Sequence, residues 1–206
     1  SVVFGPQLVD VSVGRDGAGW RLKTTPTPGL VNSANLATGS LGGLRINEWQ
    51  ASPTGGDDWI ELHNPGPAPV VLDDSHLTDD PSIAGKTKFR FGPNSFIAGG
   101  GWLLLTADGN PQNGADHVSF SLAAAGEHLL LYDPALGLLD AVDFGPQAPD
   151  TSAGRFPDGA ANFVTFTTSV SPGDSNYLPL NNAVVNEVLA HTDPPLEDAI
   201  ELHNPT

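Results

Sequence analysis

The sequence has no cysteine and no methionine, and only 8 of its 206 residues are Lys or Arg. Without cysteine the chain forms neither disulfides nor thiolate metal sites, which suits an exported bacterial protein that avoids disulfide chemistry. The 24 Asp and Glu residues outnumber the basic ones and give a formal charge of −16. Nucleic acids and anionic membranes both attract Lys and Arg, so this composition argues against either partner.

Long apolar runs and helical patterns are also missing. No apolar stretch reaches the length of a membrane span, and no window keeps a sustained helical period. The sequence has no signal peptide and no initiating methionine, so we expect a processed or excised piece of a longer protein, without direct membrane insertion. Glycine (24) and proline (19) are abundant instead, as in a turn-rich β protein.

The chain repeats itself at a spacing of about 140 residues, which decides its domain organisation. Three motifs each occur twice: INE at 46–48 with VNE at 185–187, IELHNP at 60–65 with 200–205, and FGPQ at 4–7 with 144–147. This pattern predicts one complete unit flanked by parts of two others. The predicted segments are the end of a preceding unit at 1–32, a linker at 33–43, the complete unit at 44–176, a linker at 177–183 and the start of a following unit at 184–206.

Within the complete unit, short runs of alternating or continuous apolar residues are separated by Gly, Pro, Asn and Asp. Such runs indicate strands, and many short strands at this spacing favour an all-β sandwich. The expected strands are 44–49, 59–62, 70–72, 76–78, 89–91, 102–106, 118–122, 128–132, 138–144 and 162–168.

Several motifs of the central unit, taken in order, resemble one known family. They are INE–WIELHNPG, HLTDD, FRFGPNSFIAGGGWLLL, GEHLLLYD, SAGRFPDG and a closing SPGDSN. Together they resemble the lamin-tail domain in its exported bacterial form, although the family commonly has Tyr where this sequence has His63 and His203. The resemblance implies an immunoglobulin-like β-sandwich that serves as an appendage or tandem repeat of surface or secreted proteins. The chromatin and membrane-protein partners of lamin tails do not suit a chain this acidic.

The polar residues of the repeated motif have two interpretations. Glu48 and Glu61 are a potential carboxylate pair for acid–base work or metal binding. The alternative is structural: Asn47 ties a strand edge to a turn, and Glu61 faces solvent because it alternates with Ile60 and Leu62. We favour the structural interpretation, and Asn64 before Pro65 is expected to bond the backbone of a turn.

Three acidic pairs on predicted loops are the best hint of a metal. Carboxylates on loops suit Ca²⁺, but no D-x-D-x-D-G loop is present, and a solvated acidic surface explains the same residues. The candidate ligands are Asp57, Asp58, Asp73, Asp74, Asp79 and Asp80. The six histidines show no zinc spacing, and no nucleophile motif is present.

Arginine and tryptophan give further expectations. Arg15 and Arg155 recur at one repeat position, and we predict that each pairs with a carboxylate or with backbone carbonyls, locking the loop before the last strand. The tryptophans suit either core packing or a sugar-stacking platform. We expect Trp59 and Trp102 in the core, whereas the face of Trp49 is ambiguous.

These observations favour a non-enzymatic structural or interaction module without a cofactor. Its expected role is a repeat unit of a long secreted or cell-surface bacterial protein, acting as a stalk, spacer or filament element and contacting neighbouring repeats or identical subunits. The alternative is a Ca²⁺- or glycan-binding module appended to an exported enzyme. An enzyme would need a pocket that gathers Glu48, Glu61 and a histidine.

Overall fold

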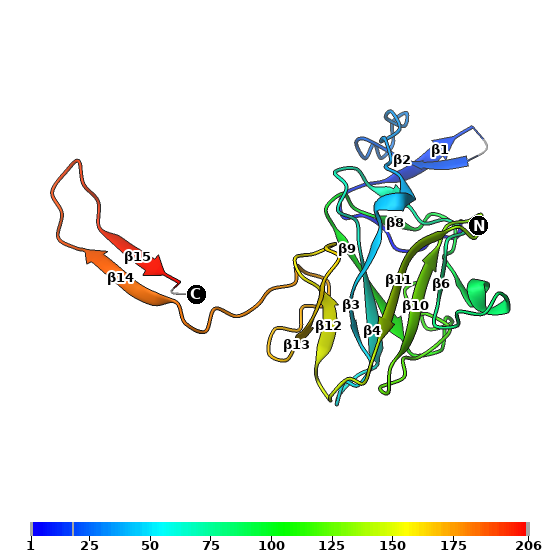
Figure 1. Ribbon diagram of the computed structural model, residues 1–206. Helices are drawn as coiled ribbons and strands as arrows, with labels where there is room; N and C mark the ends of the chain where they lie inside the picture. The colour runs from blue at the N-terminus through cyan, green and yellow to red at the C-terminus, as the bar shows by residue number, and fades with distance from the viewer. Residues whose placement is uncertain (1, 18, 205–206) are drawn as a thin grey trace.

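Strands dominate the computed structural model, which describes residues 2–17 and 19–204 (Figure 1). Two antiparallel sheets form a sandwich, so the predicted all-β class and immunoglobulin-like sandwich are confirmed. The larger sheet has the order β13-β12-β3-β4-β9. Its strands are β3 (Arg45–Gln50), β4 (Asp58–His63), β9 (Trp102–Ala107), β12 (Ser152–Arg155) and β13 (Phe163–Phe166).

The second sheet has the order β11-β10-β6-β7. It consists of β6 (His76–Thr78), β7 (Phe89–Arg90), β10 (Glu127–Tyr132) and β11 (Leu138–Phe144). A short ladder joins β5 (Val70–Val71) to β8 (Phe96–Ile97), and two 3₁₀ turns lie at η1 (Leu41–Gly43) and η2 (Ala84–Thr87). Among the described residues, no helix is long and apolar enough to cross a membrane.

The core fills the space between the two sheets. Ile60, Leu62 and Trp49 belong to it, and Trp49 lies against Phe144 with ring centroids 5.6 Å apart. Trp59 is buried, as expected, but it does not belong to this core cluster. Side chains alternate along a strand, so with Ile60 and Leu62 inside, Trp59 lies on the outer face, where its indole N–H donates to Gln50 at 2.8 Å.

Trp102 also lies outside the core cluster, against our expectation. In the β4–β9 ladder it stands opposite His63, and the two rings stack with centroids 5.1 Å apart. Trp59 and His63 are four residues apart on β4, so their side chains point to the same face of the strand. Trp102 lies opposite His63, and both tryptophans are therefore on the outer face of the larger sheet.

Two segments differ from the strand prediction. Residues 118–122 form no strand; they run beside β9, with Val118 N–H donating to the Thr106 carbonyl at 2.8 Å. Conversely, Ser152–Arg155, expected to be a loop, is the strand β12 between β3 and β13. The small residues of this segment are typical of a turn, but here they allow β12 and β3 to lie close together. A Cβ on Gly154 would lie 2.5 Å from the Asn47 carbonyl oxygen.

The N-terminal segment forms the hairpin β1 (Val13–Asp16) and β2 (Gly19–Leu22). The residues before it lie along the sandwich. Gly5 N–H donates to Pro93 at 3.1 Å, and Phe96 N–H donates to the Pro6 carbonyl at 3.0 Å. These backbone bonds connect the first segment of the chain to the central unit.

The C-terminal segment forms a second hairpin, β14 (Val184–Leu189) and β15 (Ala199–His203). Figure 1 shows this hairpin at the end of an extended segment, away from the sandwich. All eleven of its strand residues are exposed (six on β14 and five on β15).

Candidate functional site

The most elaborate polar arrangement lies on the outer face of β3 and β4. A bulge at Asn47 shifts the register, so that Ile46 pairs with Leu62 but Glu48 pairs with Glu61. Both carboxyl side chains therefore lie on one face, and both residues are 0 % exposed. The expectation that Glu61 faces solvent is wrong, because the segment after β13 (residues 169–176) covers this face and donates hydrogen bonds to it.

Each carboxylate accepts bonds from the covering segment or from the neighbouring strand. Glu48 accepts from the Ser152 hydroxyl, from the Ser171 hydroxyl at 3.0 Å and from Ser171 N–H at 3.3 Å. Glu61 accepts from Gly173 N–H at 2.7 Å and from the Asn47 amide at 2.9 Å. All of these donors belong to the chain itself, and the bonds from Ser171 and Gly173 fasten the last segment of the unit to its central strands.

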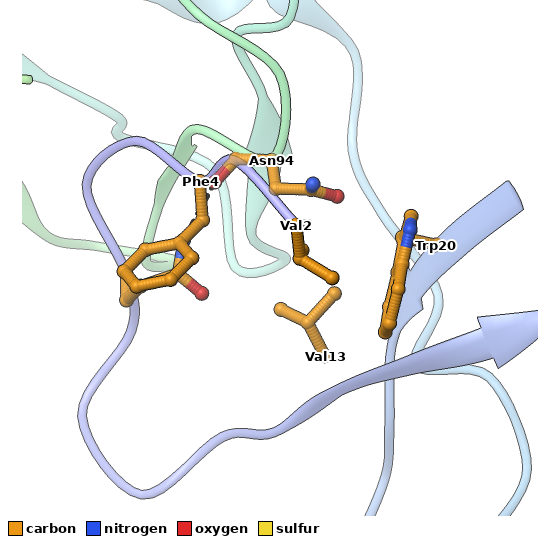
Figure 2. Close-up of a pocket in the computed structure, with 6 residues that line it drawn as sticks. Val2, Phe4, Val13, Trp20 and Asn94 are labelled. Atoms are coloured by element: carbon orange, nitrogen blue, oxygen red, sulfur yellow. Dashed lines mark hydrogen bonds between the residues drawn. The ribbon is translucent and has the colours of Figure 1, made fainter.

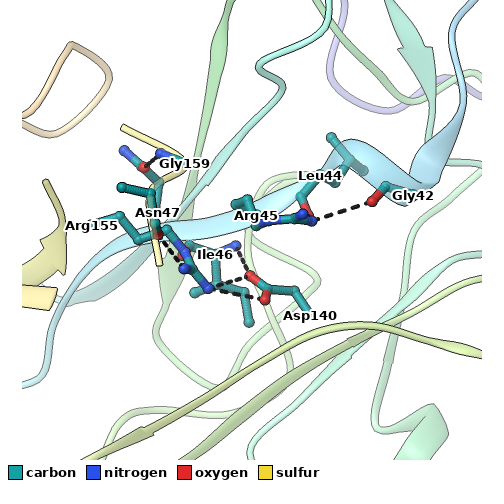
Figure 3. Close-up of polar contacts among 9 residues, drawn as sticks. Gly42, Leu44, Arg45, Ile46, Asn47, Asp140, Arg155 and Gly159 are labelled. Atoms are coloured by element: carbon teal, nitrogen blue, oxygen red, sulfur yellow. Dashed lines mark hydrogen bonds and ion pairs between the residues drawn. The ribbon is translucent and has the colours of Figure 1, made fainter. Parts of the chain in front are cut away.

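Asn47 is the centre of this arrangement, and Figure 3 shows its contact with Gly159. Its side-chain amide also donates to Asp158 at 2.9 Å, and its oxygen accepts from Gly159 N–H at 3.0 Å. Asn176 joins from the other side, donating its backbone N–H to Asp158 at 3.0 Å and its side-chain amide to the Arg155 carbonyl at 2.8 Å. The bulge, the turn after β12 and the closing segment are thereby held together.

Burial controls the ionisation of this polar cluster, defined here as Asn47, Glu48, Glu61, Asp158, Ser171, Gly173 and Asn176. Desolvation raises the pKa of Glu61 from 4.5 to about 8, with the charges of Glu48 and Asp158 adding to the shift. Desolvation likewise raises the pKa of Glu48 above its usual value. The bonds from Asn47 and Gly173 oppose the shift of Glu61 without cancelling it, so Glu61 is protonated at neutral pH.

The polar cluster does not resemble a catalytic pair, because its two carboxyl groups are buried and engaged. His63, the histidine nearest to it along β4, is committed elsewhere: its Nδ1 lies 3.1 Å from the Gly101 carbonyl oxygen, and its ring stacks on Trp102. Burial lowers the pKa of His63, which favours a neutral ring. These contacts indicate a structural role for Glu48, Glu61 and His63.

Arg155 makes a second buried connection (Figure 3). Its Nη2 lies 3.0 Å from each carboxylate oxygen of Asp140 on β11, and its Nε donates to the Ile46 carbonyl at 2.9 Å. Its Nη1 donates to Ala160, and its guanidinium lies 4.6 Å from the ring centroid of Phe163. Arg155 thus pairs with both a carboxylate and carbonyls, but from a strand rather than a loop, and links the two sheets of the sandwich.

Asn64 lies where β4 ends and holds the following turn. Its side-chain amide donates to the carbonyls of Ala68 and Ala98, each at 2.9 Å. Its side-chain oxygen accepts from Gly66 N–H at 3.1 Å. Asn64 therefore bonds the backbone on both sides of a loop crossing.

The six candidate calcium ligands are not brought together. Asp73 and Asp80 accept backbone N–H groups of Ser95 and Ser82, at 3.0 and 2.9 Å. The other contacts are Asp58 with Leu122 N–H, Asp74 with Arg90 and Asp79 with Lys88, whereas Asp57 is exposed. Across residues 2–17 and 19–204, no group of three or more His, Cys, Asp or Glu is arranged to hold a metal ion. These aspartates mostly organise loops and surface ion pairs.

A small cavity lies where the N-terminal segment meets the sandwich (Figure 2). Its volume is about 270 Å³, and its lining includes Val2, Phe4, Val13, Trp20 and Asn94. Figure 2 shows the two valines between the aromatic rings of Phe4 and Trp20. At the lower limit of ligand-pocket size, and without a charged side chain, it fits loose packing between two segments better than a ligand site.

Several residues of the polar cluster and of the Arg155 connection were missed by the sequence analysis. They are Asp140, Ser152, Asp158, Ser171, Gly173 and Asn176. A signal for the last three exists in the repeat itself. The closing segment 171–176 has a counterpart at 27–32, which also contains Pro-Gly and ends in Asn.

Comparison with known proteins gives one family. The sequence model of the family described as Lamin Tail Domain matches residues 37–146, just over half of the 206-residue chain. A search of curated proteins and a search of solved structures found no match.

Proposed function

Because the chain belongs to the lamin tail domain family, whose members are non-catalytic immunoglobulin-like modules, we propose that it is a structural and interaction module. Its role in this proposal is a tandem repeat unit of a long secreted or cell-surface bacterial protein, serving as a stalk, spacer or filament element. Its partners are neighbouring repeats or identical subunits. The acidic, cysteine-free composition supports an extracellular location.

The observation that carries the proposal is that the C-terminal hairpin repeats the geometry of β3 and β4. In β14–β15 the register shifts between Val185 and Glu187, as it does between Ile46 and Glu48. Asn186 at the shift donates to Glu201 at 2.5 Å, the counterpart of the 2.9 Å bond from Asn47 to Glu61. A motif that reproduces both a bulge and its side-chain bond supports the start of another sandwich at 184–206.

The N-terminal hairpin supports the end of a preceding sandwich at 1–32. Arg15 pairs with Trp20 across β1–β2 as Arg155 pairs with Phe163 across β12–β13. Each guanidinium lies over its aromatic partner, 5.0 Å from the ring of Trp20 in the first copy and 4.6 Å from that of Phe163 in the second. Asn32 donates to the Arg15 carbonyl at 3.2 Å, as Asn176 donates to that of Arg155. In this proposal, residues 33–43 and 177–183 are the linkers of the array.

The repeat is tested by completing the second unit. Residues 64–176 are appended directly after His203, which supplies the strands that the C-terminal hairpin lacks. With about 0.7 kcal/mol of unfolding enthalpy per residue, a completed unit of roughly 130 residues adds about 90 kcal/mol in calorimetry. Small-angle scattering should show an elongated two-unit particle. An appended segment that stays unfolded, with no added enthalpy, would contradict the repeat.

The location is tested separately, by protease treatment of intact cells of the source organism. Loss of the full-length band while a cytoplasmic marker survives is the expected result. Protection from the protease until the cells are lysed would contradict a surface location, and the same protein should then be sought in the culture medium before secretion is rejected.

A further inference from the structure

We propose that Lys23 and Asn35 form an intramolecular isopeptide bond, and that Asp16 is the catalytic residue of this reaction. The three side chains form one continuous series of hydrogen bonds at the N-terminal hairpin. Lys23 Nζ donates to Asn35 Oδ1 at 2.7 Å, and Asn35 Nδ2 donates to Asp16 Oδ2 at 2.5 Å. The proposal goes beyond the proposed function and does not depend on it, because all three reacting residues lie within residues 16–35.

The backbone places the lysine and the asparagine directly opposite each other. Lys23 forms an antiparallel bridge with Asn35. Next to this bridge, Leu36 N–H donates to the Leu22 carbonyl at 2.8 Å. The side chains of directly opposed residues lie on the same face of a sheet. The fold therefore holds the amine against the amide, and such positioning raises the rate of a reaction between two groups.

Lys23 is buried to an unusual degree for a lysine. It is 5 % exposed, and lysines are almost never fully buried unless they are paired. Asn35 and Asp16 are exposed. The amine is thus withdrawn from bulk water, whereas the amide nitrogen of Asn35 has an open path by which it can leave as ammonia.

Asp16 lies where the reaction needs a proton carrier. Lys23 Nζ, in its neutral form, attacks Asn35 Cγ, so that the Nζ–Cγ bond forms and the Cγ–Nδ2 bond breaks. The Asp16 carboxylate takes the proton that Nζ loses and delivers it to Nδ2, which leaves as ammonia. When the lysine starts as an ammonium, its extra proton ends on the ammonia. One amine and one amide give one new amide and one ammonia, so no oxidant, reductant or cofactor is consumed.

The complete unit lacks both reacting groups. Phe166 occupies the position of Lys23 in the β12–β13 register, and it is 1 % exposed. Pro179 corresponds to Asn35, because each lies three residues after the asparagine that ends the closing segment. The first copy therefore has a charged group at a position that holds an aromatic ring in the second. Burying a charge is costly, and formation of an amide removes the charge.

The bond closes residues 24–34 into a loop and ties the chain after this loop to the end of β2. A cross-link of this kind stabilises a fold by restricting the unfolded chain, as a disulfide does. Unlike a disulfide, it needs no cysteine and is not broken by a reductant. It therefore gives a chain without cysteine a covalent cross-link of its own.

The intact mass of the purified full chain tests the bond directly. Loss of ammonia lowers the mass by about 17 Da relative to the sequence. The parent chain should show this loss, whereas Lys23→Arg should not, because arginine is not deprotonated in proteins and supplies no nucleophile. A parent chain with the full mass of its sequence overturns the proposal.

Tryptic digestion locates the bond. Trypsin cleaves after Lys and Arg, and Lys23 is the only such residue between Arg21 and Arg45. Because trypsin does not cleave after an acylated lysine, the linked chain should give one peptide of residues 22–45 that lacks one ammonia. This result excludes a cyclic imide at Asn113, which causes the same mass change. Cleavage after Lys23 in a chain that has lost ammonia overturns the proposal.

Asp16→Asn tests the catalytic residue. Asparagine has nearly the same size but does not carry the proton, so the linked fraction should fall at least about tenfold. The matched control is Asp10→Asn, which removes the same charge from an exposed residue of the same segment and should keep the full ammonia loss. An undiminished linked fraction in Asp16→Asn would overturn the role of Asp16.

Discussion

Replacing Glu61 with glutamine tests whether a buried acid holds the closing segment to the sandwich. Glu61 is fully buried on β4 and its pKa is raised from 4.5 to about 8, mainly by desolvation. A carboxyl group whose pKa is higher in the folded state stabilises the fold most at low pH. Its contribution is complete below pH 4.5 and is lost as the pH rises to about 8.

The size of the effect follows from the width of this window. Each pH unit between the two pKa values costs about 1.4 kcal/mol of unfolding free energy. Between pH 5 and 7.5 the parent chain should therefore lose roughly 3 kcal/mol through Glu61 alone. Glu61→Gln removes this dependence because glutamine does not titrate in this range.

Glutamine also has a cost that does not depend on pH. Glu61 accepts from two donors, Asn47 and Gly173 N–H, and glutamine has only one oxygen for them. Leaving one buried donor without an acceptor costs about 1–3 kcal/mol. Glu61→Gln should therefore be less stable than the parent at pH 5, equal to it at a pH between about 5 and 7, and more stable at pH 8.

The assay is urea unfolding followed by tryptophan fluorescence, at half-unit intervals from pH 5 to 8.5. The matched control is Glu201→Gln, which removes the same formal charge from the same motif on the exposed hairpin, where Asn186 is the partner. Its profile should run parallel to that of the parent. If the Glu61→Gln profile also runs parallel, Glu61 does not titrate on unfolding and the argument for a buried neutral acid fails.

Further predictions concern the other contacts of the fold. Arg155→Ala removes the cation from the largely buried Asp140 carboxylate, which keeps only its bond from Ile46 N–H, and should cost about 3 kcal/mol of unfolding free energy. Arg15→Ala, at the exposed repeat position, should cost no more than about 1 kcal/mol, and equal losses would contradict the connection through Arg155. Gly154→Ala should cost about 1–3 kcal/mol because a Cβ crowds the β3 backbone, whereas Gly145→Ala, with open space around it, should be neutral. Millimolar Ca²⁺ should leave the melting midpoint unchanged, since the candidate aspartates do not converge; a rise reversed by chelator would restore the calcium hypothesis. Removing residues 181–206 should also leave the midpoint unchanged, and a drop would show that the terminal hairpin stabilises the sandwich.

The strands with a clear apolar pattern were predictable from the sequence. Segments 102–106 and 138–144, for example, lie in strands. Alternation of apolar and polar residues indicates a strand with one buried face, and a continuous apolar run indicates a strand with two. Ser152–Arg155 was not predictable in this way. It has almost no apolar side chains, and it becomes a strand because β3 and β13 offer hydrogen bonds on both of its edges.

The candidate site was predictable in its residues but not in its environment. The repeated motif pointed to Asn47, Glu48 and Glu61, and the recurrence at one repeat position pointed to Arg155. The sequence pattern did not show that a segment more than 100 residues away covers Glu61. The calcium hypothesis had a similar weakness, because Asp73 and Asp74 are adjacent in sequence but have different partners: Asp73 accepts from Ser95 N–H, and Asp74 pairs with Arg90 on β7.

The two copies of the motif show why alternation along a strand does not determine exposure. Glu61 and Glu201 occupy the same position of the same hairpin, and each accepts from the asparagine at the bulge. Glu61 is buried because Gly173 and its neighbours lie over it, whereas Glu201 is exposed on a hairpin that stands apart from the sandwich. The hairpin therefore sets up the acceptors of the polar cluster, and the closing segment decides whether they are buried.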